Sequence, residues 1–370
     1  MKFLFLSLAK HQTRYFGQLL AQPGMLGRVV HPGELPWPAW RLLAHVLKRI
    51  DWPRLVEEKC QERQVKGKYH GFAYRALLRL EMLWMGLRCA AALEREKPDA
   101  LVVWNGSNRY CQLMLALLEP GTKTFFFENG LLPGTTTLDR RGVNFHNSVP
   151  RDVDFYRAYS QRVAVPSDDK PIQLIPRKPR SEGPAPIELP KRFIFMPFQD
   201  DRDTQVRLFS PWIGSMHELF ALAEQIVEKT DWIVVLKEHP SSREQYPGLH
   251  RRCHSRLMFA NGNPTQQLIE SSSLVVSINS TVGLEAVLLN KPLLTLGQAF
   301  FNVEKVVAHA DSAEAALGLL QTFPDWPIDV EARRAFLHYL MNEYCVPGRW
   351  QDATAEHLVE VARRLRLAEV

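Results

Sequence analysis

Short apolar runs alternate with segments of helical spacing through the second half of the chain, and this alternation limits the fold more than any other feature. Each run has the length of a strand, and strands that alternate with helices pair in parallel. The runs lie at residues 193–196, 232–236, 256–259, 274–277 and 293–296. We therefore predict a parallel sheet with helices on its faces.

The first half carries a second strand–helix pattern. Apolar runs at the N-terminus, at 100–104 and at 124–127 predict buried strands, with a helix between the last two. Residues 69–96 predict a long helix, because their leucine and methionine residues recur with helical period. Polar residues that follow these strands are expected at one edge of a second parallel sheet, where open α/β sheets bind ligands.

A proline-rich stretch at 166–191 separates the halves and is predicted to be a linker. The chain has 370 residues, enough for two domains. We predict an α/β chain with an N-terminal Rossmann-like domain at 1–165 and a C-terminal Rossmann-like domain at 192–328. Residues 329–370 are expected to form helices that pack back on the domains.

The charge balance favours anionic partners, since 46 Lys and Arg against 40 Asp and Glu give a formal charge of +6. Trp37, Trp40 and Trp52 stand among basic residues, which is typical either of a surface on anionic lipid or of an amphipathic helix buried in the core.

No apolar run approaches the roughly 18 residues of a membrane span. The five cysteines are scattered, which indicates a reducing compartment, and no metal-ligand spacing is present.

Three aspartates follow the first strand of the second domain. Asp200, Asp201 and Asp203 flank Arg202 where a ligand cleft is expected. A carboxylate beside an anomeric carbon can act as a nucleophile or stabilise an oxocarbenium-like transition state. A solvated turn would use the same residues, and the pattern alone does not choose among the three.

Two further loops in this domain suit an anion. Lys237 and His239 follow the next strand, where a histidine can donate a hydrogen bond to phosphate or protonate it. Ser280 and Thr281 open a later helix, whose free N–H groups attract phosphate. Glu285, one turn further, could bind ribose hydroxyls, although simple helix capping explains this segment as well.

One loop of the first half carries a comparable motif. Glu128, Asn129 and Gly130 follow the strand at 124–127. Gly130 permits a tight turn, and the carboxylate of Glu128 is suited to deprotonate an acceptor hydroxyl. Capping of a neighbouring helix would explain Glu128 equally well.

As an ordered set, these motifs resemble the capsule-polysaccharide synthesis proteins of Gram-negative bacteria, the retaining β-Kdo transferases that use CMP-β-Kdo. The resemblance spans about residues 1–300, with a phenylalanine at position 198 where leucine is more usual. It implies a GT-B-like fold, in which two parallel sheets face each other across a cleft. The motifs are Arg14-Tyr15-Phe16, Glu128-Asn129-Gly130, Asp139 with Gly142-Val143-Asn144, Pro197-Phe198-Gln199 with Asp203-Thr204-Gln205, Lys237-Glu238-His239-Pro240, and Ser280-Thr281-Val282-Gly283-Leu284-Glu285.

The resemblance implies roles for single residues. Asp203 matches the nucleophile of a double displacement, Glu128 an acid/base residue, and His239 a contact of the CMP phosphate. Lys237, Arg202 or Arg207 would pair with the Kdo carboxylate. The other residues expected to bind substrate or nucleotide are Ser280, Thr281, Glu285, Gln199, Gln205, Asn129 and Gly130.

The predicted reaction is therefore Kdo transfer from CMP-β-Kdo to a glycan or glycolipid acceptor of capsule or lipopolysaccharide synthesis. No cofactor besides the donor and no nucleic-acid partner are expected. The expected place of action is the cytoplasm, with peripheral contact to the anionic inner membrane. The alternatives are a transferase for another nucleotide-activated acidic sugar, such as a sialyltransferase-like enzyme, a sugar-nucleotide epimerase, and a non-catalytic basic module, whose binding to phosphate backbones the acidic loop would oppose.

Overall fold

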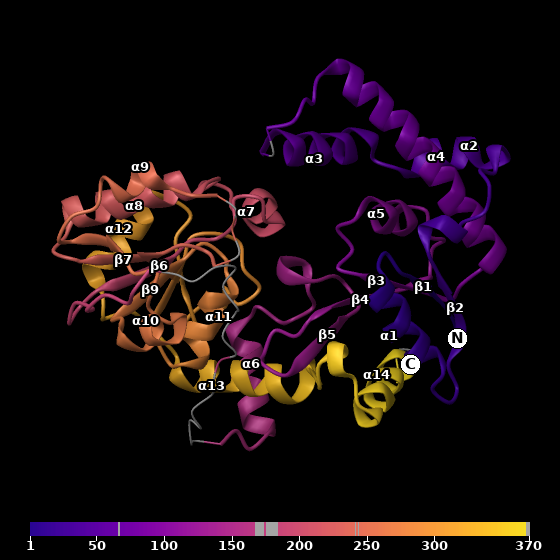
Figure 1. The fold of residues 1–370 in the computed structure, drawn as a ribbon. Coiled ribbons are helices and arrows are strands. Elements are labelled where there is room, and N and C mark those ends of the chain that lie inside the picture. Colours follow the sequence, from indigo (N-terminus) through magenta and orange to yellow (C-terminus); the bar gives the residue numbers. More distant parts are fainter. Residues whose placement is uncertain (66, 167–173, 175–183, 241, 243, 368–370) are drawn as a thin grey trace. The chain divides into compact units, whose positions relative to one another are not determined.

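The computed structural model describes residues 1–65, 67–166, 174, 184–240, 242 and 244–367 (Figure 1). These residues form two compact units. Unit 1 joins Met1–Ser148 to the C-terminal segment that begins at Leu340, and unit 2 is Val149–Tyr339. The chain therefore enters unit 2 once and returns to unit 1 to finish it.

Unit 1 is built on a sheet with the strand order β12-β5-β4-β3-β1-β2. Its strands are β1 (Lys2–Leu6), β2 (Leu26–Val30), β3 (Ala100–Trp104), β4 (Lys123–Asn129), β5 (Thr135–Asp139) and β12 (Val346–Pro347). The strands from β2 to β4 run parallel, as predicted, whereas β5 and β12 add an antiparallel edge. The sequence analysis did not predict β2 or this edge.

Helices cover both faces of this sheet (Figure 1). Side chains alternate along β1, so that Phe3 and Phe5 pack in a cluster with residues of α1 and α14, and Leu4 and Leu6 in a cluster with residues of α4 and α5. The helices are α1 (Lys10–Leu20), α2 (Leu43–Arg49), α3 (Trp52–Val65), α4 (Phe72–Glu96), α5 (Arg109–Ala116) and α14 (Ala355–Leu367), with short turns η1 (Pro32–Glu34), η2 (Trp40–Leu42), η3 (Asn144–His146), η4 (Leu340–Tyr344) and η5 (Trp350–Asp352). The predicted long helix is confirmed as α4.

Unit 2 contains the parallel sheet predicted for the second half, with the order β11-β10-β9-β6-β7-β8. Its strands are β6 (Ile194–Pro197), β7 (Val234–Lys237), β8 (Leu257–Phe259), β9 (Leu274–Ser277), β10 (Leu293–Thr295) and β11 (Ala308–His309). Each pairing between them is parallel. The five predicted strands are confirmed, and β11 extends the sheet.

The helices of unit 2 follow its strands in the expected alternation. Ile194 and Met196 of β6 pack in one apolar cluster with Leu219 and Phe220 of α8. The helices are α6 (Val153–Arg162), α7 (Thr204–Phe209), α8 (Met216–Lys229), α9 (Pro247–His250), α10 (Thr265–Ser271), α11 (Thr281–Leu288), α12 (Ala313–Thr322) and α13 (Val330–Tyr339). Among the residues that the structure describes, no helix combines the length and the apolarity needed to cross a bilayer.

The boundary between the units differs from the predicted domain limits of 165 and 192. Helix α6 belongs to unit 2 because it packs on α13: the rings of Tyr156 and Phe336 are 5.3 Å apart, and Arg157 pairs with Asp329 at 2.8 Å. Such contacts join residues far apart in sequence, so local composition does not reveal them. Most of the predicted linker, namely 167–173 and 175–183, lies outside the described residues.

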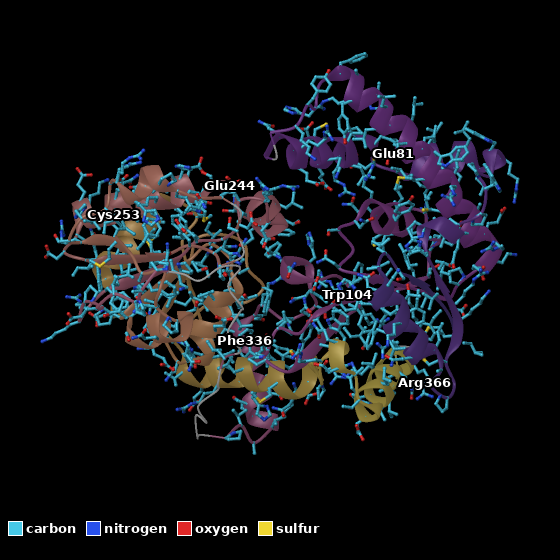
Figure 2. The ribbon with its side chains drawn as sticks, in the orientation of Figure 1. Glu81, Trp104, Glu244, Cys253, Phe336 and Arg366 are labelled. Atoms are coloured by element: carbon cyan, nitrogen blue, oxygen red, sulfur yellow. The ribbon has the colours of Figure 1, made fainter. Side chains whose placement is uncertain are left out.

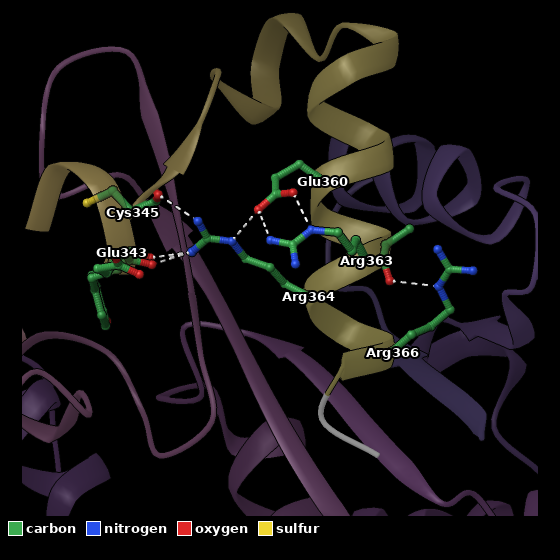
Figure 3. A network of polar contacts seen from close by, with 8 residues as sticks. Glu343, Cys345, Glu360, Arg363, Arg364 and Arg366 are labelled. Carbon is green, nitrogen blue, oxygen red and sulfur yellow. Dashed lines mark hydrogen bonds and ion pairs between the residues drawn. The ribbon is translucent and has the colours of Figure 1, made fainter. Parts of the chain in front are cut away.

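Helix α14 is tied to the segment that precedes it (Figure 3). Arg364 donates to the backbone oxygens of Glu343 and Tyr344 at 2.8 and 2.9 Å and to Glu360 at 2.7 Å. Hydrogen bonds from Arg363 and Arg364 lower the pKa of Glu360 to about 2. The last helix is therefore anchored beside the strand β12 that closes the sheet.

A buried histidine joins α14 to α1. The ring nitrogen Nδ1 of His357 donates to the Pro347 oxygen at 2.6 Å, and Nε2 therefore accepts from the hydroxyl of Tyr15 at 2.8 Å. Burial lowers the pKa of His357 below its usual value of 6.5. The neutral ring is the form that satisfies both neighbours.

We expect the free energy of unfolding of the protein to fall as the pH decreases through 6.5, the usual pKa of histidine. The unfolded chain binds a proton at His357 before the folded chain does, so acid favours unfolding in the window between the unfolded and the lowered folded pKa. Urea unfolding followed between about pH 8 and about pH 5 measures this slope. His357→Asn keeps a donor for Pro347 and should flatten it. An equal slope in wild type and variant would contradict the assignment.

Candidate functional site

The candidate donor site of unit 2 lies at the carboxyl edge of adjacent strands. The sheet order places β6 between β9 and β7. Loops that leave the carboxyl ends of neighbouring parallel strands meet at one edge. The residues in these loops are Gln199 to Gln205 after β6, Lys237 to Pro240 after β7, and Ile278 to Thr281 after β9. The fold thus brings together the three motifs of this half, as expected.

Two buried amides join the loops after β6 and β9. Gln199 Nε2 donates to Asn279 Oδ1 at 3.0 Å, and the backbone N–H of Asn279 donates to Gln199 Oε1 at 3.2 Å. Asn279 Nδ2 then donates to the backbone oxygens of Gln205 and Phe209 at 2.9 and 3.1 Å. Both amides are nearly inaccessible, with exposed fractions of 4% and 6%. The position of helix α7 is therefore set by side chains from two strand ends.

Asp203 begins helix α7. Its Oδ1 accepts the backbone N–H of Gln205 at 3.0 Å, which makes it the N-cap, and its side chain is exposed. Among the described residues, Oδ2 has no hydrogen-bond partner. The cap holds one carboxylate oxygen in place and leaves the other open to solvent.

The other two aspartates of this loop have structural contacts. Asp201 accepts the backbone N–H of Met216 at 2.8 Å and the hydroxyl of Tyr246 at 3.1 Å. Burial raises the pKa of Asp201 and also that of Tyr246. Asp200 accepts the backbone N–H of Arg202 at 3.0 Å. The structure thus separates three carboxylates that the sequence pattern alone leaves equivalent.

The basic residues expected to pair with the sugar carboxylate differ in their surroundings. The ammonium group of Lys237 donates to the backbone oxygens of Asn261 and Asn263 at 2.8 and 2.6 Å, and burial lowers its pKa. Arg202 pairs with Glu244, which Figure 2 labels. The buried Nε of Arg207 has no hydrogen-bond partner within the described part of the chain. The buried Nε of Arg202 also lacks a hydrogen-bond partner among these residues, but Arg202 has an ion pair, whereas none is described for Arg207.

The loop that carries His239 is held by its neighbours. The backbone N–H of Glu238 donates to Asn261 Oδ1 at 2.8 Å, and the Glu238 carboxylate pairs with His250 at 2.8 Å. The backbone oxygen of His239 accepts the N–H of Ser242 at 3.0 Å. These bonds fix the backbone of His239, and its side chain is partly exposed.

Helix α11 begins where the sequence analysis placed it. Ser280 is its N-cap and accepts the backbone N–H of Val282 at 3.2 Å. Thr281 is exposed and Glu285 is partly exposed. Gly283 packs closely, since a Cβ built on it would lie 3.1 Å from the ring of Phe301. The capping interpretation of Ser280 is therefore confirmed, and it leaves a phosphate-binding role of this helix end as a prediction.

In unit 1, Glu128 lies near the end of β4 and is oriented by asparagines. Its Oε2 accepts Asn105 Nδ2 at 2.5 Å, and its Oε1 accepts the backbone N–H of Asn129 at 2.8 Å. Asn105 follows β3 with φ +63°, a left-handed conformation that asparagine tolerates better than most residues. The carboxylate is thus held by side chains at the ends of two paired strands.

The C-terminal segment completes this part of unit 1. Asn129 Oδ1 accepts Trp350 Nε1 at 2.9 Å and Gln351 Nε2 at 3.1 Å. The Trp350 ring meets the Trp104 ring edge-on at 4.6 Å and the His11 ring at 5.2 Å. Residues more than two hundred positions apart therefore form one cluster beside Glu128.

Two other motif residues of unit 1 shape the backbone. Asp139 is buried and accepts five hydrogen bonds, including those from Ser148 Oγ and the Tyr344 hydroxyl, both at 2.7 Å. A Cβ on Gly130 would lie 2.0 Å from Thr135 Oγ1. Glycine is needed there because the paired strands β4 and β5 approach closely, which adds a reason to the predicted tight turn.

The sequence analysis missed several residues that organise these loops. Asn279 stands inside a motif that was singled out, and a polar side chain directly after a buried strand could have marked it. Trp350 and Asn261 have no such local signal, because their partners lie far away in the chain. Within the described residues, no group of His, Cys, Asp and Glu is arranged to hold a metal ion.

Comparison with known proteins agrees with the motifs. Residues 184–346 match the model of the family described as capsule polysaccharide biosynthesis protein. This chain is related to the capsule polysaccharide biosynthesis proteins. The resemblance drawn from the sequence is thereby confirmed, and the match covers the candidate donor site of unit 2.

Two curated relatives are similar to parts of this chain, and one of them is a capsule polysaccharide protein. Protein FixF of Sinorhizobium fredii is 38% identical over 256 residues, which cover 68% of this chain and 61% of FixF. The capsule polysaccharide export protein KpsS of Escherichia coli is 24% identical over 245 residues, which cover 50% of this chain and 63% of KpsS. This chain thus spans less than two thirds of the length of these relatives.

A solved structure shares the fold over the whole chain. The β-Kdo 2,7-transferase of Thermosulfurimonas dismutans KpsC matches with a TM-score of 0.50 and 12% identity, covering 99% of this chain and all of that chain. At this identity the match shows the fold. The predicted α/β class with two Rossmann-like parts and a GT-B-like fold is therefore confirmed.

We expect Gln199→Ala and Asn279→Ala each to destabilise unit 2 by about 2 to 3 kcal/mol, because each leaves buried polar groups without partners. Their effects should not add in the double variant, since both remove the same interaction. Chemical denaturation measures the three changes in unfolding free energy. Gln266→Ala removes an exposed bond to Glu270 in the same unit and should change stability by less than about 0.5 kcal/mol. Additive effects would show that the two amides act separately.

Proposed function

We propose that this chain is a retaining β-Kdo glycosyltransferase that uses CMP-β-Kdo. One observation carries the proposal: the β6, β7 and β9 loops meet at one carboxyl edge, where the N-cap Asp203 presents a carboxylate oxygen beside helix α7. The family match over residues 184–346 and the fold shared with a β-Kdo transferase support this assignment.

In the proposed reaction, unit 2 binds the cytidylate. His239, Ser280 and Thr281 would hold the phosphate, and Glu285 would accept hydrogen bonds from the ribose. Donors aimed at the phosphate stabilise the charge that develops when the sugar–phosphate bond breaks. Gln199, Gln205, Asn129 and Gly130 would shape the substrate contacts around them.

The first displacement forms a covalent intermediate. The open oxygen of Asp203 would attack the anomeric carbon of Kdo, and the bond to the phosphate would break with its electron pair leaving on CMP. Arg207 is the preferred partner of the Kdo carboxylate, because Lys237 is bound to two backbone oxygens and Arg202 to Glu244. The product of this step is a Kdo ester of Asp203.

The second displacement releases the sugar to the acceptor. Glu128 would take the proton of an acceptor hydroxyl, whose oxygen then attacks the anomeric carbon while the ester bond to Asp203 breaks. Two inversions give net retention. The proposed acceptor is a glycan or lipid-linked glycan of capsule or lipopolysaccharide synthesis, and the proposed place of action is the cytoplasmic face of the inner membrane.

We expect Asp203→Asn to lower the rate of Kdo transfer at least about a thousandfold and to form no sugar adduct. Asparagine is an equally good N-cap, so the helix should remain intact. Glu128→Gln should accumulate a Kdo adduct, because the ester on Asp203 still forms but the acceptor hydroxyl is no longer deprotonated to displace it. Intact-mass spectrometry after incubation with CMP-Kdo measures both.

A matched control comes from the same loop. Asp200→Asn changes a carboxylate that accepts only the backbone N–H of Arg202 among the described contacts, and it should retain turnover within about tenfold. Unchanged turnover in Asp203→Asn would remove the nucleophile assignment. Adducts from CMP-sialic acid at the same rate as from CMP-Kdo would instead favour a transferase for acidic sugars in general.

Asn105 is expected to position Glu128. Asn105→Gly tolerates the left-handed backbone but removes the donor to the carboxylate, and we expect kcat to fall about tenfold or more with little change in KM. Steady-state kinetics with varied acceptor separates the two constants. Asn108→Gly, which removes an N-cap in the same loop, serves as the control and should leave kcat nearly unchanged. A rise in KM alone would assign Asn105 to substrate binding.

A further inference from the structure

Helix α4 carries apolar side chains on two opposite faces. Leu78, Met82 and Met85 are buried in the core of unit 1. On the other side, Leu77, Leu80 and Trp84 have exposed fractions of 66%, 64% and 41%. Their spacing of three and four residues places them in one stripe along the helix. A helix that is apolar on both sides is expected to be covered on both.

The stripe continues onto the loop before α2. The rings of Trp37 and Trp84 meet edge-on at 6.1 Å, and Trp37 is 83% exposed. Arg88 of α4 donates to the backbone oxygens of Leu35 and Pro36 at 2.7 and 3.1 Å, which holds this loop against the helix. We call the exposed side chains Trp37, Trp40, Leu77, Leu80 and Trp84 the α4 surface. Contiguous exposed apolar side chains of this kind mark an interaction site.

The charge of the sequence segment that carries the α4 surface indicates what covers this surface. Residues 37–88 contain 11 Lys and Arg against 5 Asp and Glu, a difference of +6 that equals the formal charge of the whole chain. Glu81 of α4, labelled in Figure 2, is paired with Arg109 at 3.0 Å. The excess positive charge of the protein is thus concentrated in the segment that carries the α4 surface.

We infer that the α4 surface binds an anionic phospholipid bilayer. Tryptophan and leucine suit the boundary between headgroups and acyl chains, and each basic residue near an anionic surface adds to the attraction. A second copy of the chain is a poorer occupant, because two segments of the same positive charge would repel each other. The predicted amphipathic helix buried in the core is confirmed by Val46 and Ile50, and Trp52 packs against the same core. Trp37 and Trp40 are exposed, and for them the lipid alternative is the one we propose.

This inference supplies the membrane contact of the proposed function, yet its test does not need the transferase reaction. The full chain is sedimented with vesicles of phosphatidylcholine, with and without phosphatidylglycerol, in the absence of any donor. We expect binding to the phosphatidylglycerol vesicles that weakens as salt is added. Failure of the sugar-transfer assays would leave this result unchanged, and so the two proposals fail separately.

Two triple variants distinguish vesicle binding by the α4 surface from nonspecific binding by any exposed apolar side chain. Leu77→Gln with Leu80→Gln and Trp84→Gln should weaken binding at least about tenfold. Leu26→Gln with Val330→Gln and Val359→Gln changes side chains that are 66%, 52% and 53% exposed elsewhere, and it should bind like wild type. Thermal unfolding checks that both variants are folded.

Three results would overturn the inference. The first is equal binding by the α4 variant and wild type, and the second is equal binding to vesicles with and without phosphatidylglycerol. The third is a wild-type dimer in light scattering that the α4 variant converts to a monomer, which would show that a second copy covers this surface. Charge reversal by Lys48→Glu with Arg79→Glu tests the electrostatic part, because both residues are exposed and their change should weaken binding to anionic vesicles alone.

Discussion

The candidate donor site depends on the hydrogen-bonded pair of Gln199 and Asn279. Each amide satisfies the other, and Asn279 also holds the backbone at both ends of helix α7. Because both side chains are buried, the cost of breaking these bonds keeps the loops after β6 and β9 in one arrangement. The carboxylate of Asp203 stands at the start of that helix, so its position follows from a contact in which it takes no part.

Unit 1 uses asparagine side chains in a related way. Asn105 and Asn129 orient Glu128, and Trp350 from the C-terminal segment holds Asn129. Asp139 fastens the same segment through the hydroxyl of Tyr344. The end of the chain is therefore part of the structure around Glu128, which explains why unit 1 is made of two separate stretches of sequence. A truncation before Trp350 would remove the side chains that hold Asn129, together with α14.

Much of the fold could be read from local patterns, because buried parallel strands are continuous apolar runs. The strands of unit 2, the β3 and β4 strands and helix α4 are where these runs predict them. Helix α6 shows the limit: its sequence does not reveal whether it packs on one domain or the other, and contacts with α13 decide the matter. The antiparallel edge was missed because β12 has only two residues and the threonine-rich β5 is not an apolar run.

For the candidate site too, part could be predicted from the sequence and part depends on the tertiary structure. The sequence by itself determined the fold class, the loops that carry chemistry and the family resemblance, because these rest on short-range patterns of residue types. The tertiary structure alone decided which side chains already have hydrogen-bond partners within the protein. Lys237 donates to two backbone oxygens, and Asp201 accepts the hydroxyl of Tyr246. Asp203 caps a helix with one carboxylate oxygen and leaves the other open. The tertiary structure also decided that α4 exposes a second apolar face. A hydrogen bond or a buried surface depends on distances between residues far apart in the chain, and those distances exist only once the sheets have formed.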